Sequence, residues 1–236
     1  MNIKKLFGFT LAEVLFSMAI IGVVAAMTMP TLNKNFHDKL YTTQIKKTYG
    51  EIESVIEKYM SDKRTEDLLE LRGAYTAAQV ADDLAKNYFD VTLDCGGGST
   101  YTSGCFAAQG QYKTYNKTAI DEISIHKGSC NKAVLLSTST ALCITVGGGL
   151  ADDLIGFEID VNGPKPPNTA GRDLFTIAVA GNGSLHDPNC GFALAGSPAA
   201  CPCTATSYNV KFGSGFLHKL IEKGWKMDYS ECEGVN

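Results

Sequence analysis

The sequence lacks the short motifs that mark the common catalytic centres. It has no HExxH zinc motif, no Walker phosphate-binding loop, no nucleophile elbow and no pair of carboxylates at an informative spacing. Histidine is scarce, and the four that are present are scattered along the chain: His37, His126, His186 and His218. We therefore expect no catalytic residues, and we expect each histidine to be a surface or half-buried side chain.

An excess of positive charge is also missing. The 236 residues include 21 basic and 25 acidic side chains, which gives a net charge of −4. Proteins that bind nucleic acid present a basic surface to its phosphates, so the composition argues against nonspecific nucleic-acid binding. Lys34, Lys39, Lys46 and Lys47 form a local cluster, which is typical of a solvated helix face or of contact with lipid headgroups.

Charge is scarcest near the N-terminus. No charged residue occurs from Val14 to Pro30, and Glu13 is the one charged residue between Phe9 and Asn33. A helix from Phe9 to Pro30 would be about 33 Å long, which matches a hydrocarbon core of about 30 Å. A lone carboxylate in such a segment costs about 2.5–3.5 kcal/mol. We therefore expect a compensating partner, and cleavage before Phe9 would create a nearby amine.

Two simpler interpretations explain part of this segment. A secretory signal peptide requires small residues at a cleavage site after the apolar stretch, and Ala25-Ala26-Met27 meets that requirement poorly. A plain membrane anchor explains the length of the apolar run, but it explains neither Gly8-Phe9 nor Glu13.

The segment from Gly8 to Pro30, GFTLAEVLFSMAIIGVVAAMTMP, resembles the processing and assembly segment of type IV pilin-like proteins. These include pilus subunits and the pseudopilins of type II secretion. The resemblance implies that a prepilin peptidase cuts between Gly8 and Phe9 on the cytoplasmic face and methylates the new Phe9 amine. It also implies that Glu13 pairs with the Phe9 amine of a neighbouring subunit. Gly22 and Pro30 would bracket a stretch where the helix loosens in the filament.

The resemblance also implies partners and a location. The partners would be the prepilin peptidase, other pilin or pseudopilin subunits, an inner-membrane assembly platform and membrane lipid. The protein would cross the bacterial inner membrane once, with its globular region outside the cytoplasm, and would then enter a periplasmic or cell-surface filament. Without residues 1–8 the chain keeps 19 basic and 25 acidic residues, a net charge of −6.

Helical periodicity continues beyond the apolar run. Apolar residues recur at spacings of four and three, which predicts one helix from about Thr10 to Met60 whose second half is amphipathic. These residues are Ile45, Tyr49, Ile52, Ile56 and Tyr59. A second helix is expected within 64–90, where Thr76 is the N-cap and Val80, Leu84 and Tyr88 follow at helical spacing.

The pattern changes to that of β-strands from residue 119. Apolar, β-rich segments at 119–125, 133–136, 141–146, 155–161 and 174–179 have no helix between them, which predicts an antiparallel sheet. Residues 94–118 are expected to form loops, and a short helix is expected near 215–223. The fold class is therefore α+β. The resemblance implies a pilin-like layout, with a long N-terminal helix packed on a C-terminal antiparallel sheet with disulfide-tied loops.

We expect four regions along the chain. A leader occupies 1–8, the membrane-embedded half of the helix 9–30 and its amphipathic half 31–63. The globular region occupies 64–236, with helices and loops at 64–118 and the sheet and a cysteine-rich end at 119–236.

Eight cysteines lie beyond the apolar segment. Their even number favours disulfides in an oxidising compartment. The sequence does not fix the pairing, and the pairs we expect are Cys95–Cys105, Cys130–Cys143 and Cys232 with a member of the group Cys190, Cys201 and Cys203.

Zinc is the alternative use of the last cysteines. Cys201-Pro202-Cys203 could act with Cys190 and with His186 or His218, but the spacing departs from the usual Cys-x2–4-Cys pattern. Disulfides therefore remain the preferred interpretation.

A loop between two predicted strands is rich in oxygen ligands. Asp160, Asn162 and Asp173, with Asn168 nearby, offer the hard oxygens that calcium prefers, and some relatives in the resembled family bind calcium in this region. The spacing does not fit an EF-hand, because no glutamate occupies the bidentate position. Asp and Asn are also ordinary turn-forming residues, so turn formation is the alternative to a calcium site.

The sequence as a whole favours a structural subunit of a pilus or of a secretion pseudopilus. The alternative is a membrane-anchored extracellular binding protein, such as an adhesin, that uses a pilin-like anchor. An anchored enzyme is a third interpretation, and only the missing motifs argue against it.

Overall fold

A computed structural model describes residues 10–147, 153–190, 201–209 and 213–235 of the chain. The chain divides into two compact units, one that ends at Leu40 and one that begins at Tyr41. We call the second of these the head unit. Helix α1 (Leu11–Lys63) contributes residues to both units.

From Leu11 to Leu40 the first unit is entirely helical. Residues Leu11–Met29 of α1 form a stretch that is long and apolar enough to cross a membrane, and none of it is buried within the chain. Nineteen residues of helix span about 28 Å, close to the thickness of a hydrocarbon core. The predicted N-terminal apolar helix is confirmed.

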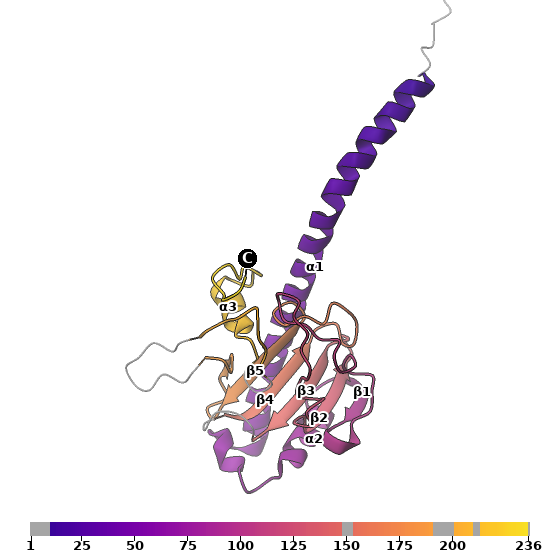
Figure 1. The fold of residues 1–236 in the computed structure, drawn as a ribbon. Coiled ribbons are helices and arrows are strands. Elements are labelled where there is room, and N and C mark those ends of the chain that lie inside the picture. The colour runs from indigo at the N-terminus through magenta and orange to yellow at the C-terminus, as the bar shows by residue number, and fades with distance from the viewer. Residues whose placement is uncertain (1–9, 148–152, 191–200, 210–212, 236) are drawn as a thin grey trace, which may run out of the picture. The chain divides into compact units, whose positions relative to one another are not determined.

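Among the described residues of the head unit, six strands form one antiparallel sheet (Figure 1). Each strand pairs with the strand that precedes it in the sequence, so the sheet is a simple meander. The strands are β1 (Val91–Gly96), β2 (Lys132–Leu136), β3 (Ala141–Val146), β4 (Asp153–Asp160), β5 (Leu174–Ala180) and β6 (Leu185–His186). The predicted antiparallel sheet is therefore confirmed.

The described part of the head unit also contains the α-helices α2 (Ala77–Asn87) and α3 (Phe216–Glu222). Short 3-10 turns occur at Leu68–Leu71 and Gly98–Thr100. Thr76 is the N-cap of α2, as expected. Its hydroxyl accepts a hydrogen bond from the Gln79 N–H, and the Gln79 side chain accepts one from the Thr76 N–H.

One face of the sheet packs against α2 and the part of α1 that lies in the head unit (Figure 1). Ile45, Ile52 and Ile56 from the predicted stripe are fully buried, in the same cluster as Leu142 and Phe157. Each such side chain contributes about 1.5–3 kcal/mol when it is removed from water. The sheet is therefore the cover that the amphipathic helix requires.

The other face of the sheet is buried as well. Ala141 and Cys143 alternate along β3 with inward-facing residues and belong to a second apolar cluster. Phe106, Tyr112 and Ile123 in the same cluster come from the long connection between β1 and β2. This connection covers a face that the alternating pattern alone would leave in solvent.

One prediction about the connection between β1 and β2 is wrong. A strand at 119–125 was expected, but the segment forms turns, with a single bridge from Ala119 to Lys113. Its apolar residues Ile120, Ile123 and Ile125 are buried against the sheet. They are apolar because they cover the sheet, and not because they extend it.

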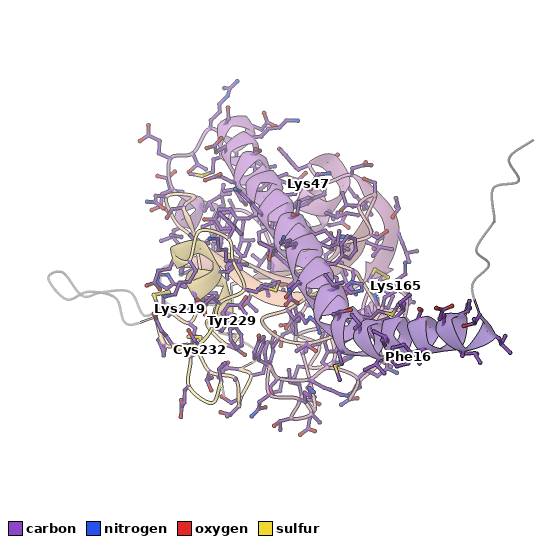
Figure 2. All side chains as sticks on the ribbon, turned by 90° about the horizontal axis from the view of Figure 1, so that it is seen from above. Phe16, Lys47, Lys165, Lys219, Tyr229 and Cys232 are labelled. Carbon is purple, nitrogen blue, oxygen red and sulfur yellow. A yellow bond between two sulfur atoms is a disulfide. The ribbon has the colours of Figure 1, made fainter. Side chains whose placement is uncertain are left out.

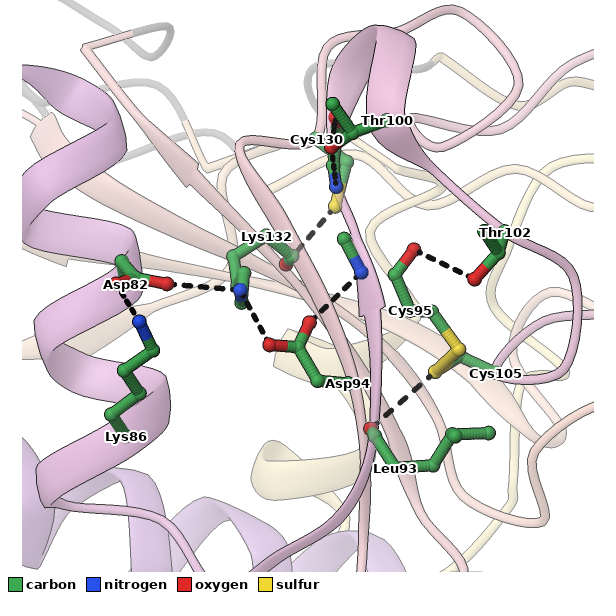
Figure 3. Close-up of polar contacts among 12 residues, drawn as sticks. Asp82, Lys86, Leu93, Asp94, Cys95, Thr100, Thr102, Cys105, Cys130 and Lys132 are labelled. Carbon is green, nitrogen blue, oxygen red and sulfur yellow. Dashed lines mark hydrogen bonds and ion pairs between the residues drawn. A yellow bond between two sulfur atoms is a disulfide. The ribbon is translucent and has the colours of Figure 1, made fainter.

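Strand β1 was missed, since residues from 94 onward were expected to be loop. Asp94 and Gly96 are poor strand formers, and the register with β2 shifts between Val91 and Leu93 and again between Asp94 and Gly96. The ammonium of Lys132 lies 2.6 Å from Asp94 and 2.9 Å from Asp82 of α2 (Figure 3). Ion pairs and long-range pairing therefore hold a strand that local propensity disfavours.

All eight cysteines are paired in disulfides. The bonds are Cys95–Cys105, Cys130–Cys143, Cys190–Cys201 and Cys203–Cys232. The first two are the expected pairs, and Cys232 joins a member of the expected group. Figure 2 shows Cys232 close to Tyr229 and Lys219 at the C-terminal end of the head unit. The last bond thus fixes the tail beside α3, where Lys219 also pairs with Glu231.

Candidate functional site

The first turn of α1 contains the lone acidic residue of the apolar segment. The Glu13 Oε2 accepts hydrogen bonds from the Thr10 N–H at 2.8 Å and from the Thr10 hydroxyl at 2.9 Å. In return, the Glu13 N–H donates to the Thr10 hydroxyl oxygen at 3.2 Å. This reciprocal pair is a capping box, which satisfies backbone N–H groups that have no partner in the helix. Glu13 therefore has a partner within its own chain.

Thr10 was missed from the sequence, although a detectable signal was present. Thr-x-x-Glu before an apolar run is the signature of a capping box. The cost of a lone carboxylate in an apolar segment predicts an amine as the partner of Glu13, whereas the structure shows Thr10 as its partner within the chain.

The structure describes only some of the other predicted residues of this segment. Gly8 and Phe9 lie outside the described residues, so cleavage and methylation there stay predictions. Gly22 and Pro30 lie within α1, which is continuous through both positions. A side chain at Gly22 would meet no atom of the described residues within 4 Å, so packing among these residues does not require glycine there. Loosening of the helix in a filament stays a prediction.

Two buried carboxylates meet where β4 ends and β5 begins. Asp160 is the last residue of β4 and pairs in register with Leu174, which directly follows Asp173. Both aspartates are fully buried. Asp160 Oδ2 accepts a hydrogen bond from the Tyr112 hydroxyl at 2.7 Å, and Asp173 Oδ2 accepts one from the Asn168 N–H at 2.8 Å. Strand pairing therefore joins two acidic residues that the sequence separates.

Burial raises the pKa of both carboxyl groups. The pKa of Asp173 rises to about 6, against the lowering effect of hydrogen bonds from the backbone of Thr169 and Asn168. The pKa of Asp160 lies well above its ordinary value, first because of burial and then because of the negative charge of Asp173. The two carboxylates thus disfavour each other's charge, and a bound cation would remove that repulsion.

Two side-chain amide oxygens in the loop that joins these two carboxylates lack a hydrogen-bond donor among the described residues. Asn162 Oδ1 and Asn168 Oδ1 are buried and accept no hydrogen bond from the residues that the structure describes. The Asn162 backbone N–H donates to Asp160 Oδ1 at 3.2 Å and the Asn168 backbone N–H donates to Asp173 Oδ2 at 2.8 Å, so the backbone at each asparagine is tied to one of the acids. Asn168 also has a φ of +51°, in the left-handed region that asparagine tolerates.

These four residues form a set of hard oxygen donors. It contains the predicted Asp160, Asn162 and Asp173, together with Asn168. Buried oxygens without a partner are rare in folded proteins, and an ordered water or a bound ion usually completes them. The chemistry of the set fits calcium better than zinc, because calcium prefers carboxylate and amide oxygens.

A third buried carboxylate, Glu158, lies two residues earlier on β4 and therefore on the same face of the sheet. Its Oε1 accepts a hydrogen bond from the Tyr208 hydroxyl, and its Oε2 accepts one from the Ser124 N–H at 2.9 Å. Burial raises the pKa of Glu158 to about 7, against the lowering effect of both hydrogen bonds. Sequence alternation had given no sign of a buried role for Glu158.

Replacing Glu158 with glutamine should weaken the pH dependence of head-unit stability. The pKa is about 7 in the folded state and 4.5 ordinarily, so the wild type is favoured at low pH and loses stability as pH rises from about 4.5 to 7. At about 1.36 kcal/mol per pKa unit, the loss is on the order of 3 kcal/mol. The measurement is urea unfolding of the full chain in detergent, followed by Trp225 fluorescence. Over this pH range the free energy of unfolding should fall correspondingly less for Glu158→Gln than for the wild type. Equal losses in both proteins would contradict this role.

Comparison with known proteins identifies one segment of the chain. A family model described as the prokaryotic N-terminal methylation motif matches residues 4–29. The matched range includes Gly8, Phe9, Glu13 and Gly22 and stops one residue before Pro30. No curated protein and no solved structure matches the chain.

Proposed function

We propose that this chain, whose N-terminus carries the type IV pilin and pseudopilin signature, is a structural subunit of a pilus-like or type II secretion filament. One observation carries the proposal: residues 4–29 match the N-terminal methylation motif. The apolar stretch Leu11–Met29 agrees with membrane anchoring before assembly. Such a subunit acts by assembling with its neighbours, so no turnover of a substrate is expected.

Processing is the first proposed step. A prepilin peptidase removes residues 1–8 and methylates the amine of Phe9, and an inner-membrane assembly platform then receives the subunit from the lipid. The cut leaves a positive amine one residue before Thr10 and four before Glu13. The chain thereby gains the cation that its apolar segment lacks.

Pairing with a neighbour is the second step. In the single subunit the capping box with Thr10 holds the Glu13 carboxylate. In the filament the Phe9 amine of an adjacent subunit approaches the same carboxylate. Two unit charges 4 Å apart attract by about 4 kcal/mol at an effective dielectric constant of 20. Misregister leaves the carboxylate without this partner, so the pair sets the axial position of each subunit.

Burial of the apolar helix completes the assembly. The side chains of Leu11–Met29 are not buried within the chain, and they pack against neighbouring helices when the subunit leaves the bilayer. The open space at Gly22 lets a neighbouring backbone approach closely.

Mass spectrometry of the protein coexpressed with a prepilin peptidase should detect a mature chain that begins at N-methylated Phe9. Gly8 admits the peptidase because it has no side chain, so Gly8→Leu should stay uncut and serves as the control. A mature start after Ala26 would instead indicate an ordinary signal peptide.

The rival is a membrane-anchored binding protein, such as an adhesin, that uses the same anchor. It predicts the same cleavage but no filament, so the Glu13 variants described below separate the two proposals.

We also propose that Asp160, Asn162, Asn168 and Asp173 bind calcium. The observation in favour is the pair of buried, unpartnered amide oxygens in the loop that joins two mutually repelling carboxylates. An ion there would accept all four oxygens as ligands and would fasten the 162–168 loop to the sheet. Extracellular calcium modules bind with dissociation constants of about 10⁻⁴–10⁻³ M, and we expect this range.

A further inference from the structure

A second group of metal-ligating side chains lies between the end of β6 and the start of α3. The Sγ atoms of Cys190 and Cys201 and a ring nitrogen of His218 all lie within 4.8 Å of one another. In the oxidised protein the two sulfurs are bonded to each other, so neither is a thiolate that could hold a metal.

Asp187 positions two of the three residues independently of the disulfide. Its backbone carbonyl accepts a hydrogen bond from the Cys190 N–H at 2.9 Å, and its Oδ2 accepts one from the His218 N–H at 3.0 Å. Asp187 is 3% exposed, so solvent does not compete for these contacts. Breaking the sulfur–sulfur bond therefore leaves Cys190 and His218 beside each other.

Other contacts hold the segment that contains Cys201. The Asn189 side-chain amide donates a hydrogen bond to the carbonyl of Pro202, which follows Cys201 directly. One residue later, the Cys203–Cys232 disulfide ties the same segment to the C-terminal tail. Both contacts follow Cys201 directly in the chain, and the bond from Asn189 keeps it near Cys190.

Exposure makes Cys190–Cys201 the disulfide that a reductant reaches first. Cys201 is partly exposed and Cys190 is 9% exposed, while the other six cysteines are each 7% exposed or less. Thiol–disulfide exchange requires direct access to a sulfur, so the bond with the largest exposure is reduced before the others.

We infer that reduction of Cys190–Cys201 converts this group into a binding site for Zn²⁺, with His218 as the third ligand. A dithiol that is itself oxidised to a disulfide supplies two electrons and two protons, which turn the bridge into two thiols. Zn²⁺ then forms two Zn–S bonds and one bond to the neutral imidazole, and both thiol protons pass to solvent. Ligand atoms of a tetrahedral zinc site lie roughly 3.4–3.8 Å apart, so only small movements are needed. Water takes the fourth position.

The full chain in detergent provides the test. Graded tris(2-carboxyethyl)phosphine followed by alkylation and peptide mapping should identify Cys190 and Cys201 as the first free thiols. The reduced chain should then bind one Co²⁺, with the thiolate-to-metal absorption of a tetrahedral site, and Zn²⁺ should displace it. The oxidised chain should bind none.

His218→Ala should weaken Zn²⁺ binding by about tenfold or more, measured by competition with a chromophoric chelator. Even residues that only hydrogen-bond to a metal ligand contribute about 10–100-fold to metal affinity. The His218 side chain is 42% exposed, so the variant should fold. His126→Ala is the matched control and should bind as the wild type does. The inference is overturned if the reduced chain binds no Co²⁺, if another disulfide opens first, or if His218→Ala binds Zn²⁺ unchanged.

Discussion

Cells that express Glu13→Ala should keep wild-type amounts of the protein in the membrane but lose it from sheared filaments, by about tenfold or more. The substitution removes a carboxylate whose presence in an apolar helix costs about 2.5–3.5 kcal/mol, so anchoring improves. It also removes the attraction to a neighbour's Phe9 amine, and each 1.4 kcal/mol lost changes the equilibrium tenfold. Immunoblots that compare sheared with membrane-bound protein measure this division.

Two further variants separate charge from helix capping. Glu13→Gln keeps the shape of the side chain and loses its charge, so it should behave like Glu13→Ala. Thr10→Val removes the hydroxyl of the capping box, at a cost of about 1 kcal/mol of helix stability, but keeps the carboxylate. It should therefore assemble much better than either Glu13 variant.

Other outcomes would change the assignment. Normal incorporation of both Glu13 variants would contradict the assembly role and favour the anchored binding protein. Equal loss in Thr10→Val and Glu13→Ala would show that Glu13 acts through the capping box rather than through its charge.

Calcium at 10 mM should raise the melting temperature of the full chain in detergent by about 5–10 °C at pH 7.5. With a dissociation constant near 10⁻⁴ M, this concentration is a hundredfold excess, which stabilises the folded state by about 2.7 kcal/mol. In a domain of this size each kcal/mol shifts the melting temperature by about 2–4 °C. Asp160→Asn should abolish the shift, and the exposed Asp121→Asn should retain it.

The pH dependence of this shift follows from Asp173, whose pKa of about 6 lies above its ordinary 3.8. Without calcium, the favourable contribution of the protonated form is present at low pH and is lost as pH rises through about 6. Calcium binds the ionised form, so it should stabilise the chain at pH 7.5 and much less at pH 5. An equal shift at both pH values, or in Asp160→Asn, would refute the site.

The sequence by itself determined the elements that rest on local periodicity and composition. The absence of charge around Glu13 predicted the apolar helix. The spacing of Ile45, Ile52 and Ile56 predicted that these side chains form a buried stripe on the second half of the helix. Thr76 fixed the start of α2, and four of the six strands were found from β-rich segments. Neighbouring strands pair without a crossover here, so chain order was enough to predict an antiparallel sheet.

The resemblance of the N-terminal segment to type IV pilin-like proteins could also be detected from residues close together in the sequence. The motif lies within residues 4–29, and its chemistry depends on residues only a few positions apart. Two cysteine pairs were also local, since Cys95–Cys105 and Cys130–Cys143 are separated by 10 and 13 residues. Short loops close at little entropic cost, so proximity in sequence was a sound guide to both pairs.

The tertiary structure alone decided which polar residues are buried. Alternation along β4 predicts that Glu158 and Asp160 share a face, but it cannot show that residues 97–130 cover that face. Likewise, Asp94 lies in a strand because Lys132, distant in sequence, neutralises it. Burial in a low-dielectric environment raises the pKa of a carboxyl group and leaves amide oxygens without water. The burial and the raised pKa values of Asp160 and Asp173 therefore result from contacts between segments that are distant in the sequence, and local patterns do not encode such contacts.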